Sequence, residues 1–277
     1  MLLCVVTILS VISAAAVSFF TGSFAGLAWL WVLPLTFLGT FLGIVLLGFL
    51  FVLFLCSLVD QSVQQEDDNK FYRFVAETIV ESALPFLRIH VKKSGLEKRP
   101  EGRFLLVCNH ASESDPIILL SCLMKRQLTF ISKREASNTF VVGPMMYRCM
   151  AQLLNRENDR EALKTILRCI QIIKEDKVSV GVFPEGGILE EYGKLHRFKP
   201  GVFKIAQKAE VPVVVCCLKN TLSVVPNILH LRPSHVEMKV VDVIPVEEVR
   251  NHTTVELAHR CHDLIAEELG PDLVAED

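Results

Sequence analysis

The stretch Arg103-Phe-Leu-Leu-Val-Cys-Asn-His-Ala-Ser-Glu-Ser-Asp-Pro116 decides the fold of this chain. Its apolar run over 103–108 predicts a buried strand. Asp115 and Pro116 predict a helix start, with Asp115 as the N-cap and Pro116 at the first helical position. Asn109 and His110 then lie in the loop beyond the carboxyl end of the strand, where open α/β sheets bind their ligands. The stretch therefore predicts a strand, a functional loop and a helix in succession.

The same alternation continues along the chain. Short apolar runs alternate with segments of helical periodicity, which implies a sheet with helices on its faces. We therefore expect an α/β fold with a mixed sheet. The expected strands are 87–92, 103–108, 128–132, 152–154, 178–183, 211–218 and 236–241, and the expected helices are 116–125, 158–175, 202–209 and 254–269.

The N-terminal arm carries no charge, because no Asp, Glu, Lys, Arg or His precedes Asp60. Leu2–Phe20 is long enough for one membrane span, at about 20 residues per crossing, and a second apolar run over 27–59 exceeds one span. A signal peptide over 2–16 is the alternative, and the missing basic n-region argues against it. We expect a transmembrane hairpin within 1–59.

Apolar residues recur at three- and four-residue steps over 70–89, which predicts an amphipathic helix interrupted near Pro85. Such a helix can face the core or lie in the lipid interface; its position after the spans favours the interface. We assign 60–92 to this helix and its linker, and 93–277 to the α/β domain. Basic residues cluster after the second apolar run, so the positive-inside tendency predicts an integral membrane protein with a cytoplasmic domain.

Composition disfavours several other classes of function. Neither charge sign dominates, which makes nucleic acid an unexpected partner. The 9 cysteines include no Cys-x-x-Cys pair, which is typical of reduced thiols in an intracellular domain, and Cys108 is expected to pack in the core. His259 and His262 face outward on the expected last helix with no converging carboxylate, so no metal site is expected.

His110 and Asp115 have the chemistry of a general-base pair. A neutral imidazole can take a proton from an alcohol near pH 7, and a carboxylate can hold its tautomer and stabilise the imidazolium. The alternative is structural, since Asp115 could act only as a helix cap. The block Phe183-Pro184-Glu185-Gly186 at the end of another expected strand favours catalysis.

The two blocks together resemble the glycerolipid acyltransferase family, whose members carry His-x4-Asp and Phe-Pro-Glu-Gly in this order. The resemblance runs from about residue 71 to 269. It implies transfer of a fatty acyl group from acyl-CoA or acyl carrier protein to the free hydroxyl of 1-acylglycerol-3-phosphate, with no bound cofactor and with the bilayer as a partner. The same chemistry on another lysolipid or an aminoacyl lipid, and a non-catalytic lipid-binding scaffold, are the alternatives.

The resemblance also implies roles for individual residues. Glu185, Gly186 and Gly187 fall in the block that contacts the acyl acceptor, and Asn109, which precedes His110 in the first block, is expected to bind substrate as well. The family usually continues that block with Thr-Arg, whereas Gly187-Ile188 stands here, so another cation is expected to meet the acceptor phosphate. Basic candidates are Lys133, Arg156 and Arg197, with Lys199 as a further possibility.

Overall fold

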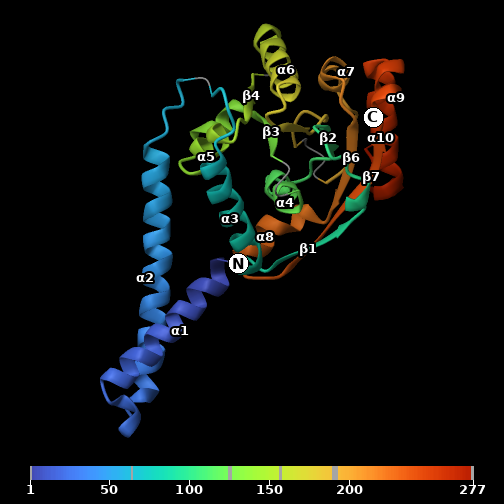
Figure 1. The fold of residues 1–277 in the computed structure, drawn as a ribbon. Helices are drawn as coiled ribbons and strands as arrows, with labels where there is room; N and C mark the ends of the chain where they lie inside the picture. The colour runs from blue at the N-terminus through green and yellow to red at the C-terminus, as the bar shows by residue number, and fades with distance from the viewer. Residues whose placement is uncertain (1, 64, 124–126, 156–157, 189–192, 276–277) are drawn as a thin grey trace. The chain divides into compact units, whose positions relative to one another are not determined.

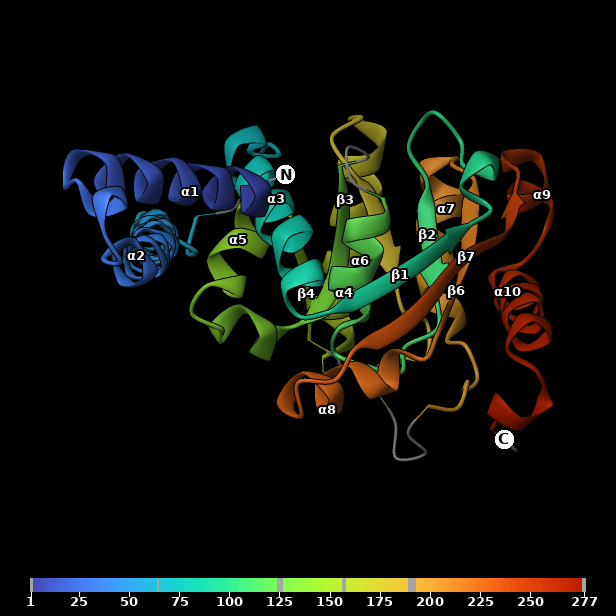
Figure 2. The same ribbon diagram turned by 90° about the horizontal axis from the view of Figure 1, so that it is seen from below.

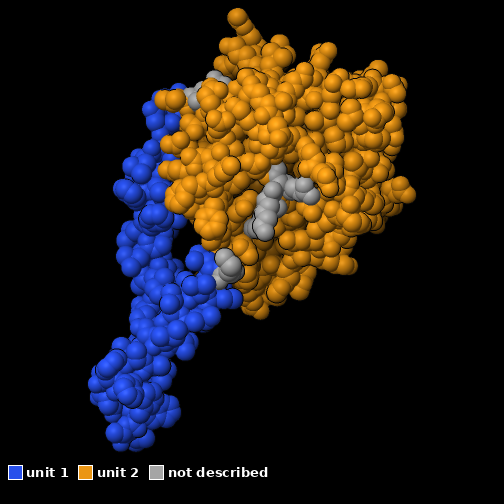
Figure 3. Space-filling model, viewed as in Figure 1, with its two compact units in different colours: residues 1–62 blue, residues 63–277 orange. Residues whose placement is uncertain are grey.

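The computed structural model describes residues 2–63, 65–123, 127–155, 158–188 and 193–275. The chain divides into two compact units, residues 1–62 and 63–277, which are coloured separately in Figure 3. Arg156, one of the basic candidates, lies outside the described residues.

Unit 1 consists of two long apolar helices. They are α1 (Leu2–Phe20) and α2 (Trp29–Ser57), joined by a short turn, and both are long and apolar enough to cross a membrane. The buried side of α1 repeats every fourth residue at Val6, Ser10, Ala14 and Ser18. Small residues at this spacing form one stripe, which lets two apolar helices approach closely.

Unit 2 is built on one mixed sheet of 7 strands in the order β1-β7-β6-β2-β5-β3-β4. From β6 to β4 every neighbouring pair is parallel, whereas β7 runs antiparallel to β6 and β1 runs parallel to β7. The strands are β1 (Ile89–Ser94), β2 (Leu105–Cys108), β3 (Leu128–Lys133), β4 (Gln152–Leu154), β5 (Ser179–Val182), β6 (Val213–Lys219) and β7 (Ser234–Ile244). Each corresponds to one of the expected strands.

Helices cover both faces of the sheet (Figures 1 and 2), which confirms the predicted fold class. One face packs against α6 (Asp159–Lys174), α7 (Lys204–Ala209), α9 (Val246–Asn251) and α10 (Thr254–Leu269). The other packs against α3 (Lys70–Phe86), α4 (Asp115–Cys122) and α8 (Val224–Leu229). The short helices α5 (Val142–Arg148), α8 and α9 are missing from the prediction, because six or seven residues are too few to show a helical period.

Helix α3 is attached to the sheet by a buried arginine. The Arg73 guanidinium donates to Asp68 Oδ2 at 2.6 Å, to the Leu128 carbonyl at 2.9 Å and to the Cys149 carbonyl at 3.1 Å. Desolvation is the largest single influence and lowers the pKa of Arg73, but the hydrogen bond to Asp68 and the nearby Cys149, Asp68 and Glu77 together outweigh it, so the pKa of Arg73 is raised. The helix that follows the membrane arm is therefore fixed to the start of β3 and the end of α5.

Candidate active site

The site lies where two neighbouring parallel strands end. After β2 the chain continues into α4 on one face of the sheet, and after β5 it continues toward α7 on the opposite face. Where connections leave adjacent parallel strands for opposite faces, the carboxyl edge between them is the place at which open α/β sheets bind ligands. The loops 109–114 and 183–188 lie at this edge.

His110 and Asp115 are joined by a hydrogen bond of 2.9 Å between Nδ1 and Oδ2. The same oxygen accepts the backbone N–H groups of Ala111 and Ser112, each at 2.8 Å. The prediction that Asp115 caps the helix is wrong, because Ser114 is the N-cap residue and Asp115 is the first residue of α4. The Asp115 side chain is directed instead toward the preceding loop, which carries His110. Because a carboxylate only accepts, the proton on the ring sits on Nδ1, and Nε2 keeps a free electron pair.

An aromatic stack fixes the plane of the His110 ring. The ring lies 4.2 Å from that of Phe183, at 20° between planes, and Phe183 in turn stacks on Phe130 at 5.5 Å. The side chain of His110 is 16% exposed, whereas that of Asp115 is fully buried. The imidazole is thus held by a buried carboxylate at one nitrogen and by an apolar plane, while a small part of the ring still meets solvent.

Glu185 connects the two loops. It is buried, and its Oε1 accepts from the backbone N–H of His110 at 2.6 Å while Oε2 accepts from that of His196 at 3.0 Å. The backbone N–H of Lys199 donates to the Pro184 carbonyl at 2.9 Å, which fastens the same segment again. The carboxylate therefore holds the histidine loop, the glycine loop and the chain at 196–199 together.

Gly186 allows the backbone of this loop to lie close to the side chain of Lys199. It adopts φ of 86°, a left-handed conformation that favours glycine, and a Cβ at this position would lie 2.6 Å from Lys199 Nζ. The ammonium group of Lys199 consequently rests directly on the glycine backbone. Sequence reasoning named Lys199 only as a further possibility, because spacing alone could not show that its side chain folds back onto the loop.

The other predicted residues occupy different positions at this edge of the sheet. Lys133 is the exposed last residue of β3, and Arg197 is exposed in the segment that Glu185 holds. Both polar atoms of the buried Asn109 amide bond to the backbone of Leu218, at 2.9 and 2.8 Å. Asn109 therefore fastens the end of β2 to β6, which favours a positioning role over substrate contact.

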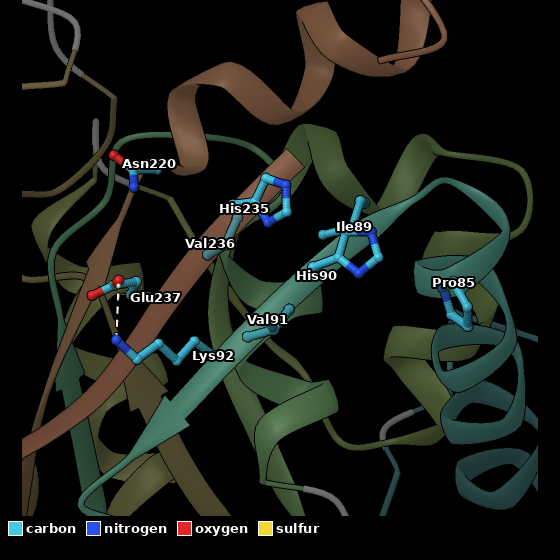
Figure 4. Close-up of a pocket in the computed structure, with 9 residues that line it drawn as sticks. All are labelled: Pro85, Ile89, His90, Val91, Lys92, Asn220, His235, Val236 and Glu237. Carbon is cyan, nitrogen blue, oxygen red and sulfur yellow. Dashed lines mark ion pairs between the residues drawn. The ribbon is translucent and has the colours of Figure 1, made fainter. Parts of the chain in front are cut away.

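Cys108 is a packed core residue, as predicted. It is fully buried, and burial raises the pKa of its thiol well above the ordinary value, with nearby thiols and carboxylates adding to the effect. A cavity of about 630 Å³ lies elsewhere, between the end of α3 and the starts of β1 and β7 (Figure 4), and neither His110 nor Asp115 lines it. Among the described residues no cluster of His, Cys, Asp or Glu suits a metal ion.

Comparison with known proteins gives a consistent set of relatives. The model of the Acyltransferase family matches residues 90–219, which include both loops. The chain is 33% identical over 162 residues to the chloroplastic 1-acyl-sn-glycerol-3-phosphate acyltransferase BAT2 of Brassica napus, covering 57% of this chain and 45% of that protein. It is 30% identical over 162 residues to a 1-acyl-sn-glycerol-3-phosphate acyltransferase of Cocos nucifera, covering 57% and 52%. The chain spans about half the length of these curated relatives.

A solved structure extends the likeness to most of the fold. The crystal structure of the 1-acyl-sn-glycerophosphate acyltransferase PlsC from Thermotoga maritima superposes with a TM-score of 0.57 at 25% identity, covering 79% of this chain and 87% of that one. The matched family region includes the strands β2 and β5 and the loops that follow them. Residues 90–219 of the chain therefore match the Acyltransferase family, and the fold around them is similar to that of a solved 1-acyl-sn-glycerophosphate acyltransferase.

Proposed function

We propose that this protein transfers a fatty acyl group from a thioester to the free hydroxyl of 1-acylglycerol-3-phosphate, forming phosphatidic acid. The observation that carries the proposal is the pair His110–Asp115, hydrogen-bonded at 2.9 Å at the carboxyl edge of the sheet and within the region that matches the Acyltransferase family. Its relatives bear the name of this activity. A binding module without chemistry has no need of a buried carboxylate that orients a partly exposed imidazole.

The base step follows from the tautomer of His110. Nε2 takes the proton of the acceptor hydroxyl, and the buried Asp115 carboxylate stabilises the imidazolium that forms. The alkoxide oxygen bonds to the thioester carbonyl carbon, and the tetrahedral intermediate then expels the thiolate. The thiolate recovers the proton from Nε2, so the histidine returns to its starting state and no acyl-enzyme is formed. Backbone N–H groups at the two loops would stabilise the oxyanion.

The acceptor phosphate is assigned to the cations at the glycine loop. Gly186 has no side chain to hinder a phosphate, and the Lys199 ammonium lies against it. Lys133 and Arg197 stand at the same edge as further contacts, and Arg156 keeps the phosphate role that its sequence position suggests. Glu185 and Gly187 shape this loop, and the Glu185 carboxylate accepts the backbone N–H groups of His110 and His196.

The membrane arm brings the enzyme to its substrates. We propose that α1 and α2 cross the bilayer as a hairpin, with the α/β domain on the cytoplasmic face and α3 at the interface. Both helices have the length and hydropathy of spans. The exposed Phe71 and Phe74 on α3 provide the apolar side chains that an interfacial helix needs. The donor is acyl-CoA or acyl carrier protein.

The test is an assay of the full-length protein in detergent with 1-acylglycerol-3-phosphate and each donor. The wild type should form phosphatidic acid, and His110→Ala should reduce turnover by orders of magnitude while the protein stays folded. Equal rates for the two proteins would remove His110 from the mechanism. No product from folded wild type with either donor, or with other lysolipid acceptors, would leave the scaffold function in its place.

A further inference from the structure

An exposed apolar surface lies at the same edge of the sheet as the active site. Phe86 at the end of α3 is 69% exposed, Leu229 at the end of α8 is 77% exposed, and Leu231 just beyond is 81% exposed. Phe86 comes from one segment and Leu229 and Leu231 come from another, far apart in the sequence. The Arg88 guanidinium bridges these segments by donating to the Leu231 carbonyl at 3.0 Å. We call Phe86, Leu229 and Leu231 the apolar cluster.

The topology of the sheet explains why the apolar cluster lies near the site. Because β7 is antiparallel to β6, its first residues lie at the carboxyl edge, and Ile89 of β1 pairs with Ser234 there. Figures 1 and 2 both show α8 beside the starts of β1 and β7. The connection that holds α8 also reaches the chain beyond the glycine loop, since a Cβ on Gly193 would lie 3.1 Å from the Leu222 side chain.

The charges around the apolar cluster are positive. No Asp or Glu occurs between Glu81 and Glu97, nor between Glu210 and Glu237. The exposed Arg88 and Arg232 stand within these two stretches. Lys92 adds a further cation along the neighbouring cavity wall, although it pairs with Glu237 at 3.5 Å (Figure 4). Exposed apolar side chains with a cationic border match the interface of an anionic bilayer.

The backbone is strained where it presents this surface. Arg88 and Leu231 both adopt left-handed conformations, with φ of 58° and 55°. Residues with a Cβ rarely adopt this conformation, and such strain is concentrated where it positions side chains for function. Leu231 is 81% exposed in this conformation.

We infer that the apolar cluster is a membrane-contacting surface, in addition to the arm and to Phe71 and Phe74 of α3, that extends from the end of α3 onto the α/β domain, and that its partner is the interface of an anionic phospholipid bilayer. Phe86, Leu229 and Leu231 enter the boundary between headgroups and acyl chains, while Arg88 and Arg232 meet the phosphates. This contact would hold the carboxyl edge against the surface from which lysophospholipid arrives. The advantage for substrate access rests on the proposed function, whereas the membrane contact itself does not.

A tryptophan probe tests the inference in the full-length protein. Trp29 and Trp31 are the 2 tryptophans of the chain, so the double substitution Trp29→Phe/Trp31→Phe removes the tryptophan fluorescence of the native sequence. Leu229→Trp is added in one protein and Leu163→Trp in another, Leu163 being an exposed leucine on α6. Both are reconstituted in vesicles of phosphatidylcholine and phosphatidylglycerol, with and without bromine on the acyl chains.

Brominated lipid should quench the tryptophan fluorescence of the Leu229→Trp protein several-fold more than that of the Leu163→Trp protein. The emission of the Leu229→Trp protein should also be shifted to shorter wavelength. Replacing Arg88 and Arg232 with Gln, or omitting phosphatidylglycerol, should weaken that quenching. Equal quenching of the two probes, or none at Leu229→Trp, would overturn the inference. Activity is not part of the measurement, so failure here is distinct from failure of the proposed reaction.

Discussion

Replacing Asp115 with Asn removes one negative charge beside His110 and little else. Asn has the shape of Asp, so its carbonyl oxygen can take the place of Oδ2 and keep the bonds to the ring Nδ1 and to the backbone N–H groups of Ala111 and Ser112. Oδ1, which has no hydrogen-bond partner among the residues that the structure describes, becomes the amide nitrogen. We expect the loop to stay in place and the free energy of unfolding to fall by about 1–3 kcal/mol for the buried NH2.

The effect on turnover follows from the charge separation. Nδ1 and Oδ2 are 2.9 Å apart, so the centres of the imidazolium and the carboxylate lie roughly 4 Å apart. At an effective dielectric constant of about 20, such a pair is stabilised by about 4 kcal/mol. The imidazolium exists only after proton transfer, so this energy is lost from the transition state, and turnover should fall about 10³-fold.

The assay compares initial rates of phosphatidic acid formation at saturating substrate, with thermal unfolding as the check on the fold. The chain contains a matched control, because His262 and Asp263 also form a His–Asp contact, at 3.4 Å, on the surface of α10. Asp263→Asn should retain the wild-type rate. A rate for Asp115→Asn within about tenfold of wild type, from folded protein, would refute the assignment of Asp115 as the partner of the base.

Four further outcomes are expected from other positions. Cys108→Ala should keep the wild-type rate within a few-fold, because its buried thiol stays protonated; inactivation of a folded variant would revive the cysteine as a nucleophile. Arg73→Ala leaves a buried carboxylate without its cation and should lower the free energy of unfolding by about 3–5 kcal/mol in denaturant titrations. Glu185→Gln sets an NH2 group against a backbone N–H, so turnover should fall at least tenfold, whereas a silent variant would contradict the bridging role. The hydrogen bond from Lys239 is the largest cause of the lowered pKa of Glu268. Glu268→Gln should therefore cost less than about 1 kcal/mol at pH 7, and the difference should vanish as the pH falls below about 4, through the lowered pKa, in urea melts at the two pH values.

The fold was largely predictable because its strands are short, buried and apolar. The runs 104–108 and 211–218 contain no charged, amide or hydroxyl side chain, which is the pattern of a parallel sheet covered on both faces. The order of the strands was not predictable, because pairing depends on contacts between distant segments. The short helix α8, which contains Pro226, gives no periodic signal either.

The sequence indicated the residues of the candidate site, but it could not show how they bond to one another. The spacing of His110 and Asp115 indicated a pair, whereas the direction of the Asp115 side chain depends on a backbone that turns back at 111–112. Whether Glu185 contacts substrate or supports the loop was left open by the sequence. The bonds to the amides of residues 110 and 196 become visible only once strands from different parts of the chain lie side by side.

The left-handed conformation of Leu231 has a consequence for how this protein would evolve or be engineered for thermostability. Asn tolerates that backbone region far better than Leu, so Leu231→Asn should raise the melting temperature while deleting one apolar contact with lipid. Selection for thermostability alone would therefore favour this replacement and would weaken the inferred contact between the α/β domain and the bilayer. Screens that reward activity on vesicles would keep the leucine, so the two selections should diverge at this position.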